Sequence, residues 1–132
     1  MVEKGSIPAD VGCDHGYVAI YFDPKTGSHP MCLAMDVNEG PLERAREHVE
    51  EYGLAAYIDV RLSDGLSGLP LPRGKPEADT LLAAGMGGRL TVKILEEGAE
   101  KLAGMRWVIL QPQSEPWLVR KSLRNFRIFH YR

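Results

Sequence analysis

Asp-Val-Gly-Cys-Asp-His-Gly-Tyr, at residues 10–17, is the segment that constrains the fold most strongly. Its first residues end the short apolar segment 7–11, and its last ones open segment 16–22, which can form a helix. Gly12 and Gly16 allow a sharp turn and a close approach of the backbone to a ligand, because glycine carries no Cβ. A strand followed by a glycine-containing loop and a helix is typical of the first unit of an α/β fold that binds a ligand at its strand ends.

The rest of the chain alternates apolar runs with amphipathic stretches. Apolar runs predict strands at 31–37, 78–84 and 107–110, and alternating apolar and polar residues predict one at 56–62. A further strand is predicted to begin at 126–131. Helical spacing of apolar residues predicts helices at 41–52, stopped by Gly53, at 90–102, and at 114–125, capped by Ser114. Strands that alternate with helices predict an α/β fold with a doubly wound, mostly parallel sheet, formed as one domain over residues 1–132.

The first loop also constrains the chemistry of the ligand. A dinucleotide-binding enzyme would carry G-x-G-x-x-G here and place a pyrophosphate on the helix N-terminus. This loop instead reads D-x-G-x-D-x-G, and the carboxylates of Asp10 and Asp14 would repel a pyrophosphate. They suit a ligand with a cationic centre and an ammonium group, and S-adenosylmethionine has both. The alternative is a tight turn in which one of the two aspartates caps a helix.

Polar or glycine-rich residues follow the other predicted strands. Asp36, 24 residues after Gly12, can accept hydrogen bonds from both hydroxyls of a ribose, or can cap the next helix. Asp64 can accept from an adenine amino group, although an ordinary turn explains it slightly better. The segment Gly-Met-Gly-Gly at 85–88 leaves its backbone open to a substrate, and Gln-Pro-Gln at 111–113 can read the edge of a base. Together these residues predict a nucleoside site along one rim of the sheet.

Composition narrows the class of protein. The chain of 132 residues is long enough for one hydrophobic core and has no apolar run near the roughly 18 residues of a membrane span. Its two cysteines, Cys13 and Cys32, predict a cytoplasmic protein with free thiols, and no cluster has metal-ligand spacing, so we expect no metal. The net charge of −2 argues against a general nucleic-acid binder, but residues 114–132 hold five basic residues and one acid. That segment is either a phosphate-binding face or a solvated helix face.

Five segments, in this order, closely resemble the TrmK family of bacterial tRNA (adenine-22-N1)-methyltransferases. They are Asp-Val-Gly-Cys-Asp-His-Gly-Tyr at 10–17, Ala-Met-Asp-Val-Asn-Glu-Gly-Pro-Leu-Glu-Arg-Ala at 34–45, Arg-Leu-Ser-Asp-Gly-Leu at 61–66, Ala-Gly-Met-Gly-Gly at 84–88 and Leu-Gln-Pro-Gln-Ser-Glu at 110–115. The resemblance covers roughly residues 4–125. It implies a Rossmann-like, class I methyltransferase fold, S-adenosylmethionine as the cofactor, tRNA as the partner and methylation of adenine N1 as the reaction.

The resemblance also implies roles for single residues. Asp14 and His15 would be catalytic, the first by stabilising the cationic methylated ring and the second by orienting the base or removing a proton. The implied cofactor-binding residues are Asp10, Gly12, Asp14, His15 and Gly16 for the methionine part, Asp36 for the ribose, Asp64 for the adenine, and Gly85. The implied substrate-binding residues are Met86, Gly87, Gly88, Gln111, Pro112 and Gln113.

Members of the family look longer than this chain at both ends. We therefore expect a chain truncated at the C-terminal end, without the family's C-terminal hairpin and helical tRNA-binding domain. Two alternatives remain beside catalysis on tRNA. One is a methyltransferase for another substrate, and the other is a methyltransferase-fold module that binds S-adenosylmethionine or RNA without catalysis. An NAD-dependent oxidoreductase is disfavoured, since the loop lacks G-x-G-x-x-G.

Overall fold

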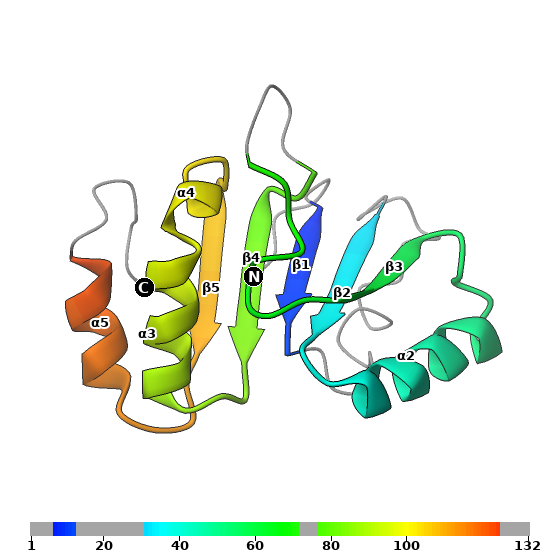
Figure 1. Ribbon diagram of the computed structural model, residues 1–132, viewed down its shortest axis with the longest axis horizontal. Helices are drawn as coiled ribbons and strands as arrows, with labels where there is room; N and C mark the ends of the chain where they lie inside the picture. The colour runs from blue at the N-terminus through cyan, green and yellow to red at the C-terminus, as the bar shows by residue number, and fades with distance from the viewer. Residues whose placement is uncertain (1–6, 13–30, 72–76, 125–132) are drawn as a thin grey trace.

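A computed structural model describes residues 7–12, 31–71 and 77–124 of the chain (Figure 1). Strands and helices alternate in these ranges, as the sequence predicts. The elements are β1 (Pro8–Val11), β2 (Cys32–Asp36), α2 (Glu39–Glu51), β3 (Ile58–Leu62), β4 (Thr80–Ala84), α3 (Gly88–Glu97), α4 (Ala99–Leu102), β5 (Trp107–Gln111) and α5 (Pro116–Leu123). The helix expected at 16–22 and the strand expected at 126–131 lie outside the described residues.

The five strands form one parallel sheet in the order β3-β2-β1-β4-β5, which confirms the predicted fold class. After β3 the chain crosses to the other side of β1 and continues with β4, so the strand order reverses next to β1. A point of reversal is where such sheets bind ligands, outside the carboxyl ends of the strands. Figure 1 shows β1, β2 and β4 pointing to one edge, from which α2 and α3 start.

Helices cover both faces of the sheet because side chains alternate along each strand. Leu33 and Met35 of β2 belong to the core under α3, α4 and α5, whereas Cys32 and Ala34 belong to the core under α2. Helix α2 ends as predicted, since Gly53 follows it with φ 69°. The Gly53 N–H donates to Glu50 O at 2.9 Å, which satisfies one of the last carbonyls of the helix.

Helices α2 and α3 each begin two residues earlier than predicted, at Glu39 and Gly88, and two further predictions about helices are wrong. The single helix expected at 90–102 is broken at Gly98 into α3 and α4. A Cβ built on Gly98 would lie 2.9 Å from Leu66 Cβ and 3.0 Å from Ile94 O, so the turn after β3 presses against the backbone at this glycine. The last helix begins at Pro116, and its N-cap is Glu115, not Ser114. The Ser114 hydroxyl instead accepts a hydrogen bond from the Gly88 N–H at the N-terminus of α3.

Candidate functional site

Asp10, at the carboxyl end of the central strand β1, is a buried carboxyl group with an unused oxygen. Its side chain is 5% exposed, and no hydrogen bond reaches its Oδ2 atom in the described part of the chain. Burial, and then the charge of Asp36 nearby, raise the pKa of Asp10 to about 7. An unpaired buried carboxylate is costly, so this position favours either a proton or a cationic partner.

Gly12 turns the chain directly after β1, with φ at 71°. A Cβ at this position would lie 3.3 Å from the terminal methyl carbon of Met86, so the Met86 side chain lies across the start of the loop. Met86 also packs against the core beneath it. The ends of β1 and β4 are therefore in contact. The remaining predicted residues of this loop, Asp14, His15 and Gly16, lie outside the described residues, and their roles stay predictions.

Asp36, at the end of β2, is also buried and bonds to the turn that precedes the next helix. Its Oδ1 atom accepts the Asn38 N–H at 3.0 Å, and its carbonyl oxygen accepts the Ser63 N–H at 2.8 Å. Asn38 occupies the N-cap position, yet its side chain makes no capping hydrogen bond. Asp36 thus forms a turn with the N-cap residue just before α2, but it is not itself the cap of the helix. Because a carboxylate offers about four lone-pair sites, it leaves room for further hydrogen bonds.

The turn after β3 is held by hydrogen bonds from within. The Ser63 hydroxyl donates to Gly65 O at 2.7 Å and accepts the Gly68 N–H at 2.9 Å, while the Asp64 N–H donates to Ser67 Oγ at 3.0 Å. These bonds leave the Asp64 carboxylate exposed beside a cavity of about 200 Å³. Three hydrogen bonds thus hold the turn together, and it presents the exposed Asp64 carboxylate at the strand end.

Lys101 of α4 binds two backbone carbonyls of the same turn. Its ammonium group donates to Leu66 O at 2.8 Å and to Ser67 O at 3.1 Å. Sequence reasoning missed both Lys101 and the buried Ser63 as positioning residues. Lys101 is distant in the chain from the turn, so no sequence motif connects the two. Lys101 belongs to α4, the short helix that follows the break at Gly98.

The segments that follow β4 and β5 stay paired beyond the ends of the strands. The Gly85 N–H donates to Gln111 O at 3.2 Å, and the Gln113 N–H donates to Met86 O at 2.7 Å. An isolated parallel β-bridge then pairs Gly87 with Ser114. The two motifs, 26 residues apart in the chain, therefore form one structure, with the side chains of Gln111 and Gln113 exposed on it.

Gly88 closes this paired structure at the N-terminus of α3. Its N–H donates to Ser114 Oγ at 3.3 Å. A Cβ on Gly88 would lie 2.5 Å from Ser114 O and 2.6 Å from Glu115 O, so only glycine fits against that backbone. Glu115 has a left-handed backbone (φ 47°) and pairs with Arg89 at 3.3 Å. The turn before α5 and the start of α3 are thus a single packing unit.

The structure brings the described candidate residues to one rim of the sheet. They are Asp10, Gly12, Asp36, Asp64, Gly85, Met86, Gly87, Gly88, Gln111, Pro112 and Gln113. The described residues contain no group of three or more His, Cys, Asp or Glu side chains that could hold a metal ion. Among them there is also no helix with the length and apolar character needed to cross a membrane.

Known proteins match the chain along nearly its whole length. A family model described as a methyltransferase domain matches residues 1–130. The tRNA (adenine(22)-N(1))-methyltransferase of Bacillus subtilis (strain 168) is 37% identical over 128 residues, which is 96% of this chain and 51% of that protein. The chain thus spans about half the length of this curated relative.

Solved structures match in the same way. The crystal structure of the B. subtilis M1A22 tRNA methyltransferase TrmK has a TM-score of 0.84 and 35% identity, covering 96% of this chain and 52% of that one. Streptococcus pneumoniae Sp1610 in complex with S-adenosyl-L-methionine has a TM-score of 0.85 and 38% identity, covering 93% and 56%. M. capricolum TrmK in complex with S-adenosyl-homocysteine has a TM-score of 0.66 and 28% identity, covering 76% and 44%.

Proposed function

This chain belongs to the methyltransferase-domain family and groups there with the TrmK proteins, and from that premise we propose that it binds S-adenosylmethionine and methylates adenine N1 in tRNA. The observation that carries the proposal is the unpartnered, buried Oδ2 atom of Asp10 beside the positive-φ turn at Gly12. It is a site for a cationic ligand at the point where the strand order reverses.

The residues of the rim fit this cofactor better than they fit a dinucleotide. S-adenosylmethionine supplies a methyl group on a sulfonium, together with an α-ammonium group from which Asp10 can accept a hydrogen bond. A pyrophosphate would instead add negative charge beside Asp10 and Asp36, which already repel each other. Asp36 has lone pairs left for the ribose hydroxyls, and the exposed carboxylate of Asp64 is held where it can accept from the adenine amino group.

The proposed reaction depends mainly on positioning. Adenine N1 carries an in-plane lone pair and attacks the methyl carbon in line, so no strong base is needed, and the sulfonium leaves as a neutral thioether. Orientation and electrostatics then supply the rate enhancement. The paired segments 85–88 and 111–113 form a rigid edge for the base, with two exposed glutamine amides as hydrogen-bonding groups. Asp14 is proposed to stabilise the cationic product ring, and His15 to orient the base.

A second function would use the same rim, namely binding of S-adenosylmethionine or RNA without methyl transfer. Binding and methylation assays separate the two functions.

The first experiment is calorimetric titration of the chain with S-adenosylhomocysteine. We expect micromolar or tighter binding by the wild type, weaker binding by Asp10→Asn, and unchanged binding by Glu43→Gln, an exposed carboxylate of α2. A folded chain that does not bind refutes the cofactor site. Methyl transfer to tRNA transcripts follows, with Asp14→Ala expected to abolish it. Binding without any transfer supports the module instead, and near-normal transfer by Asp14→Ala removes that residue from its role.

A further inference from the structure

We propose that the exposed side of α5 contacts the phosphate backbone of the RNA, with an aromatic ring that stacks on a base. This surface, called the α5 outer face, consists of Trp117, Arg120, Lys121 and Arg124. Their spacing of i, i+3, i+4 and i+7 places them on one side of the helix. All four are exposed, and the opposite side is buried through Val119, Ser122 and Leu123.

The charge of this face is not balanced locally. Helix α5 contains no acidic residue, and Glu115 just before it is paired with Arg89. In the part of the chain that the structure describes, no ion pair or side-chain hydrogen bond engages the three cations of the face. The rest of the protein is acidic, since the whole chain has a net charge of −2. A concentrated basic patch on an acidic body attracts a polyanion to one place.

Trp117 distinguishes the face from an ordinary solvated helix surface. Its side chain is 59% exposed, although a tryptophan of this size could gain much by burial. An exposed aromatic ring flanked by cations is the combination with which proteins hold single-stranded RNA, through stacking on a base and contact with phosphates. A solvated face would need the charges but not the ring.

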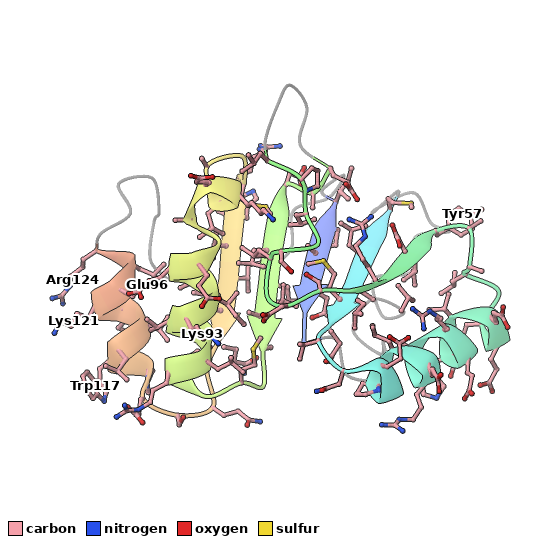
Figure 2. The ribbon with its side chains drawn as sticks, viewed as in Figure 1. Tyr57, Lys93, Glu96, Trp117, Lys121 and Arg124 are labelled. Carbon is pink, nitrogen blue, oxygen red and sulfur yellow. The ribbon has the colours of Figure 1, made fainter. Side chains whose placement is uncertain are left out.

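The position of the face connects it to the rim. Helix α5 starts directly after the segment 111–115, which forms one side of the proposed base site. Figure 2 shows Trp117 at the end of α5 nearer the rim, with Lys121 and Arg124 farther along the helix. Helix α3 beside it offers Lys93 and Glu96, whose charges cancel, so the basic character comes from α5. An RNA strand with one base at the rim can continue along this face.

The inference rests on the proposed function, because that function makes RNA the polyanion that approaches this edge. The test is fluorescence anisotropy of a labelled tRNA transcript with the full chain over a range of salt concentrations. For Lys121→Gln/Arg124→Gln we expect weaker binding and a log–log salt slope smaller by about 0.7–0.9 for each phosphate that the protein no longer neutralises. The matched control is Arg44→Gln/Arg46→Gln on α2, which removes two exposed cations and should leave RNA binding unchanged.

Trp117→Ala tests the stacking separately. We expect RNA affinity to fall about 5- to 150-fold with an unchanged salt slope, because the substitution removes the stacking of one base and leaves the phosphate-binding cations in place. Circular dichroism establishes that each variant is folded. Titration with S-adenosylhomocysteine is measured on the same samples, so that failure of the cofactor site is seen independently of RNA binding.

Loss of RNA affinity in the α5 variants alone, with cofactor binding as in the wild type, supports the proposal. If the wild-type chain binds no RNA at low salt, or if the α5 and α2 variants bind it equally well, the α5 outer face is not an RNA surface. If the α5 variants sediment differently from the wild type but bind RNA with the same affinity, the α5 outer face is a contact surface for protein, and the proposal is overturned as well.

Discussion

The buried carboxyl group of Asp10 makes the stability of this protein depend on pH, and Asp10→Asn should remove that dependence. Burial and the charge of Asp36 raise the pKa of Asp10 from 3.8 to about 7. The folded state therefore holds the proton more tightly than the unfolded chain does. Stability is greatest below pH 4 as far as this group is concerned, and it falls as the pH rises towards 7, because the unfolded chain ionises first.

The size of the effect follows from the two pKa values. A shift of one pKa unit corresponds to about 1.4 kcal/mol, so the full loss between pH 4 and pH 8 is roughly 4 kcal/mol. Between pH 5 and pH 7 the expected loss is about 2 kcal/mol. This is a large part of the total stability of a small domain, which is on the order of 5–15 kcal/mol. In Asp10→Asn no proton is bound or released at this position, so the loss disappears.

Urea unfolding at pH 5, 6, 7 and 8 measures the difference between wild type and Asp10→Asn directly. Other titrating groups contribute to both proteins and cancel in the comparison. The variant should gain about 2 kcal/mol relative to the wild type between pH 5 and pH 7. Asp64→Asn, which changes an exposed carboxylate of the same rim, is the control and should run parallel to the wild type. A constant difference between Asp10→Asn and the wild type across this range would refute the burial argument.

Two further predictions concern packing and thiol chemistry. Gly88→Ala should lower the free energy of unfolding by about 2 kcal/mol or more in urea titrations, because its Cβ meets two carbonyl oxygens at 2.5 and 2.6 Å. Gly40→Ala, whose nearest neighbour is Arg44 at 3.9 Å, should be neutral or up to about 1 kcal/mol more stable, and equal effects at both sites would contradict the packing. Cys32 is 1% exposed, and burial followed by the Asp10 charge raises its pKa to about 12. In a Cys13→Ser variant the folded protein should react with a thiol reagent at least about tenfold more slowly than it does in urea, and equal rates would argue against this burial.

The order and type of the elements could be predicted because most strands are apolar runs, β3 alternates apolar and charged residues, and each long helix has an apolar face. The rim could be predicted for the same reason, since parallel strands bring their carboxyl ends to one edge. The break at Gly98 could not, because it depends on Leu66, which is distant in the chain and contacts the helix only after the turn following β3 has formed. The N-cap role of Ser114 was predicted because a serine before a helix usually caps it. The prediction is wrong, since the Ser114 hydroxyl accepts a hydrogen bond from the Gly88 N–H, a residue distant in the chain.

The site could be predicted only unevenly, for a related reason. The buried, unpaired state of Asp10 follows from a carboxyl group placed in the central strand, but the rise in its pKa also depends on Asp36, which only the strand register brings close. The hydrogen bonds of Asp36 and Asp64 with their own turns depend on local geometry, which the spacing of residues does not reveal. Membership in the methyltransferase-domain family is confirmed by the family model that matches residues 1–130, and the resemblance of five short motifs to the TrmK proteins is borne out by 37% identity over 128 residues to one of them.

The continued pairing of segments 85–88 and 111–115 limits how these segments can be exchanged between proteins. The conformation of each segment depends on hydrogen bonds to the other. These bonds join Gly85 to Gln111, Met86 to Gln113 and Gly88 to Ser114. A substitution in one segment alone would therefore weaken its hydrogen bonds and packing with the unchanged segment. The two segments should therefore be exchanged between related proteins together, and a graft that moves only one of them should disrupt the edge that it was meant to transfer.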